Sequence, residues 1–172
     1  MQTTKRRFPL TEILLGLLIF FLHYTELFTF QIRHASLMLL LPLLLTVAMN
    51  DTGMGGLLYG LFFGLLCDSV SSFSACYHTL FFMFCGFAVS ALSRYIFNRN
   101  LPAAITLSLV FSLLYFGLKW LIFYYFTGVQ GKMFYLLQFS LPSALFTGVS
   151  ILPFYFIERA LSRRFARRHR SL

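Results

Sequence analysis

The acidic residue Asp68 follows three glycines at four-residue spacing, Gly56, Gly60 and Gly64, in an otherwise apolar stretch. Residues four apart share one face of a helix, so the glycines and the carboxylate form a single row. Glycines in a membrane helix let a second helix approach to backbone distance. A carboxylate there is too costly to face lipid and should point into protein or toward water. We expect this face to pack inside the protein or to receive a transmembrane helix of a partner.

Four further polar residues, His23, Glu26, His78 and Lys119, lie within or beside apolar stretches. The topology derived below from the charge pattern places them, with Asp68, in the outer third of a helix bundle. They could line an outward-facing cavity, and the sharper hypothesis is a charged pair between Lys119 and either Asp68 or Glu26. The alternative is ordinary interfacial polarity, with the Lys119 side chain reaching toward the membrane surface.

The sequence holds no arrangement typical of a metal site or an enzyme. Cys67, Cys76 and Cys85 recur every nine residues, whereas zinc and iron–sulfur sites use closer pairs such as C-x2-C. There is no H-x3-H or H-E-x2-H pair for a metalloprotease and no G-x-S-x-G serine. The acidic residues are too scattered for the D-x2-D pattern of a lipid or prenyl transferase. We expect no metal, no cofactor and no enzymatic activity.

The composition indicates a chain dissolved in lipid. Of its 172 residues 59% are hydrophobic and 11% charged, with a mean hydropathy of +0.79, whereas soluble domains carry about 25% charged residues. A helix needs roughly 20 apolar residues to cross a bilayer. We predict a single all-α transmembrane domain over residues 1–172, with six spans at 8–30, 35–49, 53–67, 74–93, 101–126 and 134–157.

The second and third spans are short, and Pro42 in the middle of the second favours a bend because proline removes a helical hydrogen bond. A re-entrant hairpin in place of these two spans stays open. Six spans place eleven of the fourteen lysines and arginines on one side, which predicts that both termini are cytoplasmic. The basic tail at 158–172 should attract anionic lipid headgroups. Since the tail adjoins a span, we do not expect a nucleic-acid partner.

The stretch from Gly56 to Asp68, followed by Ser69–His78, resembles the glycine–aspartate core of the rod shape-determining MreD family. The chain length, the basic amino terminus, Pro42 and the basic carboxyl end are similar to that family as well. Family members commonly have a glycine about eight positions after the aspartate, and this chain has Cys76 there.

The resemblance implies a six-helix transmembrane bundle similar to the substrate-binding subunits of energy-coupling-factor vitamin transporters. It implies a multi-pass protein of the bacterial inner membrane, a non-enzymatic scaffold of the cell-wall elongation complex that maintains rod shape. Its partners would be the bitopic protein MreC and, with it, RodA-type glycosyltransferase, a class B penicillin-binding protein and MreB. Asp68 would be the signature acid, with Gly60 and Gly64 as its packing partners.

A different function stays open from the residues alone. The protein could be the substrate-binding subunit of a small-molecule, vitamin-type transporter, with the outer polar residues as its pocket. Such subunits usually carry rows of small residues on the first helix, where they meet an energising module. The stretch Ile13–Phe20 lacks such a row.

Overall fold

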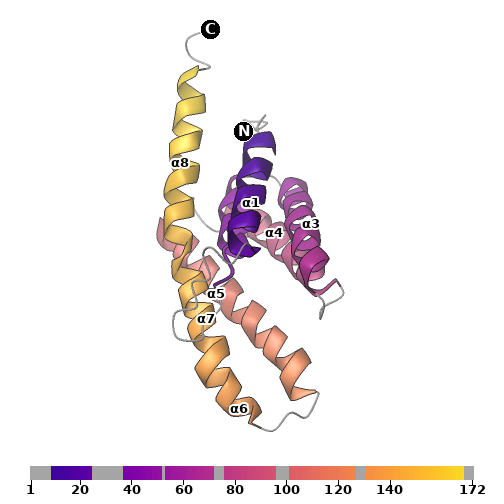
Figure 1. Ribbon diagram of the computed structural model, residues 1–172. Helices are drawn as coiled ribbons and strands as arrows, with labels where there is room; N and C mark the ends of the chain where they lie inside the picture. Colours follow the sequence, from indigo (N-terminus) through magenta and orange to yellow (C-terminus); the bar gives the residue numbers. More distant parts are fainter. Residues whose placement is uncertain are drawn as a thin grey trace.

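The computed structural model describes residues 9–24, 37–51, 53–71, 76–95, 101–126 and 131–168. Over these residues the chain folds into six helical segments without any strand (Figure 1). The first five segments are α1 (Pro9–Tyr24), α2 (Leu40–Asn50), α3 (Gly53–Val70), α4 (Tyr77–Tyr95), and α5 (Leu101–Trp120) with the π-helical turn η1 (Leu121–Tyr125). The last comprises α6 (Lys132–Tyr135), the π-helical turn η2 (Leu136–Ser140), α7 (Leu141–Val149) and α8 (Ile151–Arg168).

Three helical stretches are long and apolar enough to cross a membrane, namely Gly53–Val70, Leu101–Tyr125 and Met133–Ala160. The apolar parts of α1, α2 and α4 are shorter, at Leu10–His23, Leu40–Asn50 and Tyr77–Ser93. The prediction of an all-helical chain is therefore confirmed. The third span is longer than predicted, since α3 continues to Val70.

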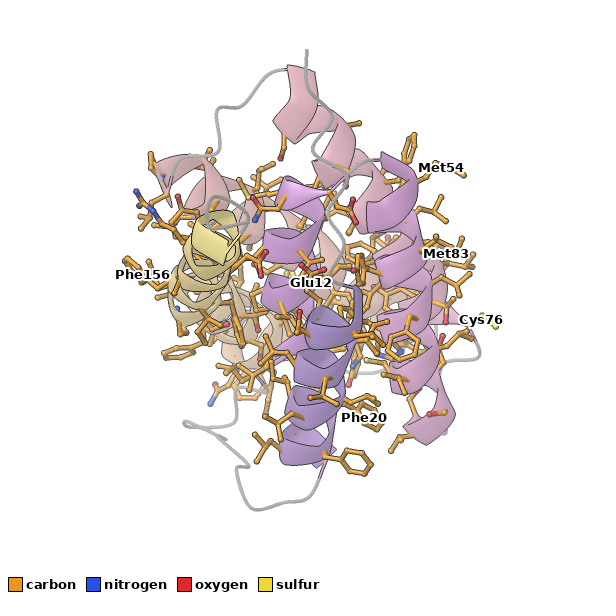
Figure 2. All side chains as sticks on the ribbon, turned by 90° about the horizontal axis from the view of Figure 1, so that it is seen from above. Glu12, Phe20, Met54, Cys76, Met83 and Phe156 are labelled. Atoms are coloured by element: carbon orange, nitrogen blue, oxygen red, sulfur yellow. The ribbon has the colours of Figure 1, made fainter. Side chains whose placement is uncertain are left out.

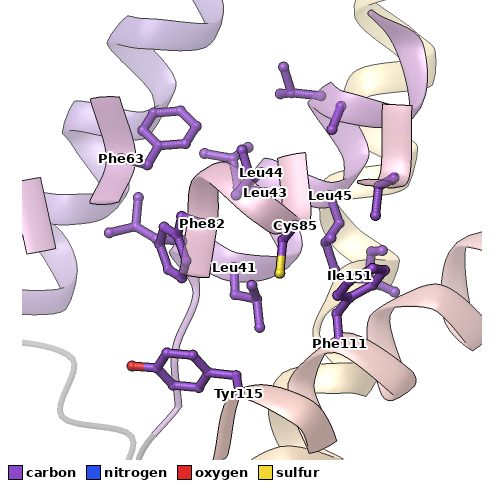
Figure 3. Packing of buried hydrophobic residues seen from close by; sticks show 14 of the residues in the cluster. Leu41, Leu43, Leu44, Leu45, Phe63, Phe82, Cys85, Phe111, Tyr115 and Ile151 are labelled. Atoms are coloured by element: carbon purple, nitrogen blue, oxygen red, sulfur yellow. The ribbon is translucent and has the colours of Figure 1, made fainter. Parts of the chain in front are cut away.

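The shortest of these segments, α2, forms the centre of the molecule. Every residue from Leu40 to Met49 is buried. Leu41, Leu44 and Leu45 are fully enclosed by side chains from the surrounding helices, among them Phe82 of α4 and Ile151 of α8 (Figure 3). A helix that is apolar on all sides belongs inside a protein. Because its neighbours cover it, α2 has no need to match the thickness of the bilayer.

The predicted bend at Pro42 is wrong. Pro42 lies in the first turn of α2, which begins at Leu40. The N–H groups of a first turn have no partner within the helix, so a proline there costs no hydrogen bond. The residues before Leu37 that would have formed the start of this span lie outside the described residues.

The beginning of α1 and the end of α8 lie at the same end of the molecule (Figure 1). A chain that crosses the membrane an even number of times has both of its ends on the same side. Which side of the membrane this end occupies stays a prediction from the charge pattern. Seen from that end, Glu12 of α1 lies toward the middle of the molecule, while Met54 and Phe156 mark its periphery (Figure 2). Glu12 is buried, whereas Met54 and Phe156 are exposed.

Candidate functional site

The glycine row of α3 is the surface on which α4 packs. A Cβ atom on Gly56 would overlap the carbonyl oxygen of Gly86, one on Gly60 the carbonyl oxygen of Phe82, and one on Gly64 the Cα atom of Thr79. As the residue number increases along α3, the number of the residue that it contacts on α4 decreases, so the two helices run antiparallel. Backbone atoms of two helices come this close only where side chains are missing.

The closest approach is reciprocal, because a Cβ on Gly86 would in turn overlap the carbonyl oxygen of Gly56. At the same level the hydroxyl of Ser90 donates a hydrogen bond of 2.7 Å to the carbonyl oxygen of Ala48 on α2. Three helices therefore meet at Gly56 with small residues on two of them. Of the two roles expected for the glycine row, packing inside the protein or receiving a partner helix, the structure shows packing inside the protein, against α4.

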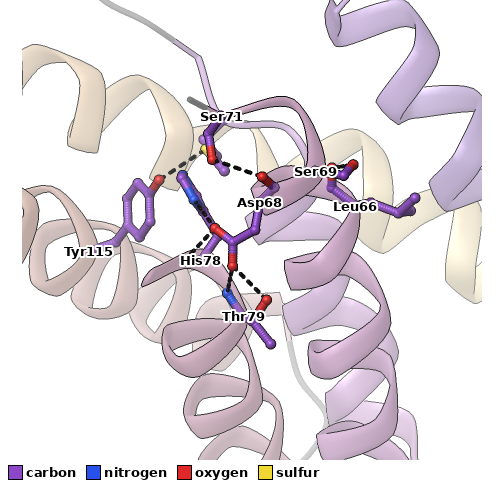
Figure 4. A network of polar contacts seen from close by, with 8 residues as sticks. Leu66, Asp68, Ser69, Ser71, His78, Thr79 and Tyr115 are labelled. Atoms are coloured by element: carbon purple, nitrogen blue, oxygen red, sulfur yellow. Dashed lines mark hydrogen bonds and ion pairs between the residues drawn. The ribbon is translucent and has the colours of Figure 1, made fainter. Parts of the chain in front are cut away.

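Asp68 is the next position of the same row, and its carboxylate meets the start of α4 (Figure 4). Oδ1 accepts a hydrogen bond of 3.2 Å from the backbone N–H of His78 and lies 2.8 Å from Nδ1 of the His78 ring. Oδ2 accepts bonds from the backbone N–H of Thr79 at 2.9 Å and from its hydroxyl at 2.6 Å. The side chains of Asp68 and His78 are 10% and 6% exposed.

This geometry makes Asp68 a helix cap supplied by a neighbouring helix. The first N–H groups of a helix have no partner within it, and a side-chain oxygen usually satisfies one of them. Asp68 satisfies those of His78 and Thr79 together, and its negative charge lies at the positive end of the α4 dipole. The glycines make this possible, since they bring α4 close enough for the carboxylate to reach its first turn.

The contact leaves the carboxylate no capacity for further chemistry. An ionised carboxylate offers about four lone-pair positions, and four donor groups of His78 and Thr79 occupy them. Elsewhere in the described part of the chain, no group of three His, Cys, Asp or Glu side chains could hold a metal ion. The arrangement binds two helices to each other and offers no free base or ligand.

Aromatic rings enclose the other side of His78. Its ring lies edge-on to those of Tyr77 and Phe82, with centroids 5.6 and 6.4 Å away, and 5.9 Å from that of Tyr115 on α5. The hydroxyl of Tyr77 donates a bond of 2.8 Å to the backbone carbonyl of Tyr115. These contacts connect the Asp68 cap to α5 and keep water away from its hydrogen bonds, which strengthens them.

The structure brings together only some of the predicted polar cluster. Lys119 is close enough to His78 for an electrostatic interaction, and the ion pair that Asp68 makes is with His78. The predicted pair of Lys119 with Asp68 or Glu26 stays a prediction. His23 lies in the last turn of α1. Glu26 falls outside the described residues. The transporter pocket stays a prediction that the structure does not favour, because the ring of His78 is already engaged.

Two residues of the site were missed from the sequence. Thr79 supplies half of the bonds to Asp68, and Gly86 is the counterpart of Gly56. A signal for Gly86 exists, since Gly86 and Ser90 form a second pair of small residues at four-residue spacing. No comparable signal marks Thr79, because its importance comes from its place in the first turn of α4.

Cys76 precedes α4 in a left-handed backbone conformation, with φ of 64°. Such a φ is rare for residues with a side chain and favours glycine. The thiol is exposed at the edge of the molecule (Figure 2). The resemblance placed a glycine at this position, and the backbone here adopts the conformation that a glycine would favour.

The helical fold and this inward-facing contact define a class, that of integral membrane proteins whose buried polar residues hold helices together. The family model of the rod shape-determining protein MreD matches residues 5–165. The chain therefore belongs to the MreD family. Neither a curated protein nor a solved structure matches the chain, so the likeness to energy-coupling-factor transporter subunits stays a prediction.

Proposed function

We propose that this protein is a non-enzymatic scaffold of the bacterial cell-wall elongation complex, which binds MreC and, through it, peptidoglycan synthases. The observation that carries the proposal is the full engagement of Asp68. The carboxylate of Asp68, the acid that the family resemblance singles out, is fully engaged by groups of His78 and Thr79 on α4. A residue used in this way supports a rigid bundle that holds neighbours in place, with no turnover of its own.

A partner helix must then bind somewhere other than the glycine row, since α4 covers it. The outer faces of the bundle are apolar and uncovered in the monomer. On α1 the exposed residues Leu10, Leu14 and Leu18 repeat every four positions, which is the spacing of one helix face. On α4 the exposed face contains Leu80, Phe84 and Phe87. A single apolar helix such as the MreC span would pack on a face of this kind.

Site-specific photo-crosslinking in the membrane tests the proposal. A photoreactive residue is placed singly at the exposed positions Leu14, Leu58, Phe84, Leu114 and Leu145, one each on α1, α3, α4, α5 and α7. Leu44, which is fully buried in α2, is the matched control. We expect adducts with MreC from one face or two adjoining faces, and none from Leu44. Adducts from no face, in cells whose rod shape depends on the protein, would overturn direct binding of MreC.

A further inference from the structure

Two helical legs, α5 with η1 and α6 with η2, project past the ends of α3 and α4, away from the beginning of α1 (Figure 1). Tyr77, the first residue of α4, donates its hydrogen bond to α5 at Tyr115. Beyond Tyr115 the first leg continues to Tyr125, roughly 15 Å along its axis. The second leg lies alongside it. We refer to residues 120–126 and 131–140 as the projecting segment.

A stack of aromatic rings joins the two legs of the projecting segment. The rings of Tyr124 and Tyr135 have centroids 4.1 Å apart, and the ring of Phe139 lies 4.5 Å from that of Tyr135. Outside this stack the surface is apolar, with five large side chains that are between 48% and 74% exposed, namely Tyr125, Phe126, Met133, Phe134 and Leu137. Since these side chains are exposed, no described helix of the chain covers them.

The residue types of the projecting segment indicate what covers this surface. The chain's only tryptophan, Trp120, lies here together with the exposed Tyr125. Tryptophan and tyrosine are concentrated where a membrane meets water, because their rings are apolar and their N–H or O–H groups are polar. The exposed large hydrophobic side chains of α1 and α4 are leucines and phenylalanines instead. The surface therefore changes from a type that suits hydrocarbon to an interfacial type at the projecting segment.

The adjoining end of α3 suits a deeper position in the membrane. The hydroxyl of Ser69 donates to the carbonyl of Leu66 at 2.7 Å, and that of Ser71 to the carbonyl of Asp68 at 3.5 Å. The side chain of Asp68, whose acceptor positions are engaged by α4, is 10% exposed. Polar groups that are satisfied within the protein can lie at a depth without water. The end of α3 can therefore lie below the headgroups.

We propose that the projecting segment binds the boundary between headgroups and acyl chains, through the exposed rings of Tyr125, Phe126 and Phe134. Because Lys132 is the one charged residue of the segment, it takes the glycerol-ester region of any phospholipid and does not select headgroup charge. This anchor sets the depth of the bundle and keeps the Asp68 cap below the headgroups. It goes beyond the proposed binding of MreC, since it needs lipid alone.

The depth of single tryptophans in the full chain, reconstituted into phosphatidylcholine bilayers, tests the proposal. Bromine on the acyl chains quenches a tryptophan at the same depth. Trp120→Phe removes the native tryptophan, and a new one is introduced by Phe126→Trp in the projecting segment or by Leu80→Trp in the first turn of α4, where Leu80 is exposed. We expect bromine near the headgroups to quench Phe126→Trp most strongly, and bromine deeper in the acyl chains to quench Leu80→Trp.

Three results overturn the proposal. If both tryptophans lie at the same depth, the segment does not project toward the interface. Quenching of Phe126→Trp by aqueous acrylamide and not by bromine places the segment in water. Protection of Phe126→Trp from both quenchers means that a second copy of the chain covers it.

A second set of variants tests the anchor itself, with Leu80→Trp as the probe of depth. Replacing Tyr125, Phe126 and Phe134 by serine should move the probe toward the membrane surface, while circular dichroism shows unchanged helix content. The matched control, Phe126→Tyr with Phe134→Tyr, keeps the interfacial rings and should leave the depth of the probe unchanged. An unchanged depth in the serine variant, or an equal shift in the control, overturns the proposal as well.

Discussion

The carboxylate of Asp68 accepts two hydrogen bonds from one residue, Thr79, through the backbone N–H at 2.9 Å and through the hydroxyl at 2.6 Å. The last turn of α3 thereby closes the first turn of α4. Paired bonds of this kind fix the rotation of both helices, because neither helix can turn without losing one of them. The Asp68 contact thus sets the register that the glycine row permits.

Asp68→Ala should lower the free energy of unfolding by about 3 kcal/mol, since it leaves the N–H groups of His78 and Thr79 buried without an acceptor. Thermal unfolding in detergent micelles measures the effect. Ser69→Ala is the control, because the Ser69 hydroxyl bonds to the carbonyl of Leu66 within its own helix, at an exposed position. Equal unfolding midpoints for the two variants would contradict a capping role for Asp68.

Thr79→Val keeps the shape of the side chain and removes the hydroxyl that donates to Asp68. Hydrogen bonds to charged groups contribute about 1.5–3 kcal/mol, so we expect a loss of stability in that range. Thr79→Ser keeps the hydroxyl and should lose less. A double-mutant cycle with Asp68→Asn measures the coupling. Additive effects of the two substitutions would show that the bond contributes nothing to stability.

Gly60→Ala should destabilise the α3–α4 pair by about 1–3 kcal/mol, as overpacking does, because its Cβ would overlap the backbone of Phe82. Gly117→Ala on α5 is the matched control, since a Cβ there meets no atom within 4 Å. Alanine in an open helical position is neutral or stabilises by up to about 1 kcal/mol. If the two variants shifted the unfolding midpoint by the same amount, the close contact between α3 and α4 at Gly60 would not contribute to stability.

Cys76→Gly should stabilise the protein by about 1 kcal/mol, because the left-handed φ of 64° is costly for a residue with a Cβ. Cys76→Val should destabilise it, since β-branched residues tolerate this conformation least. Circular dichroism melting curves of the three proteins give the order directly. A valine variant as stable as the glycine variant would mean that the turn adopts another conformation in the membrane.

The helices, and the α3 half of the site, could be predicted from the sequence. Hydropathy located the third, fourth and fifth segments within about three residues at each end, and the spacing of Gly56, Gly60, Gly64 and Asp68 identified the buried face of α3. Spacing could not identify the helix that covers this face. A row of glycines receives a neighbour of the same chain or of another protein by the same physics, so only the fold could assign α4 to it.

Two other expectations show the same limit. Opposite charges at similar depth favour a pair of Lys119 with Asp68, whereas the structure gives Asp68 backbone donors, which cannot be recognised from the sequence. The short length of the second apolar stretch suggested a bent or re-entrant span. Length alone does not reveal that α2 is enclosed on all sides, because burial depends on helices that are distant along the chain.

The enclosed position of α2 constrains how the protein is made. A helix of eleven residues is too short for lipid alone to retain it in the membrane. When it leaves the ribosome, the helices that will surround it, from α3 to α8, have yet to be synthesised. Its final placement must therefore await their arrival, so the translocon or a membrane chaperone has to shelter the segment meanwhile. Truncated chains that end soon after Asn50 should be poorly integrated and quickly degraded.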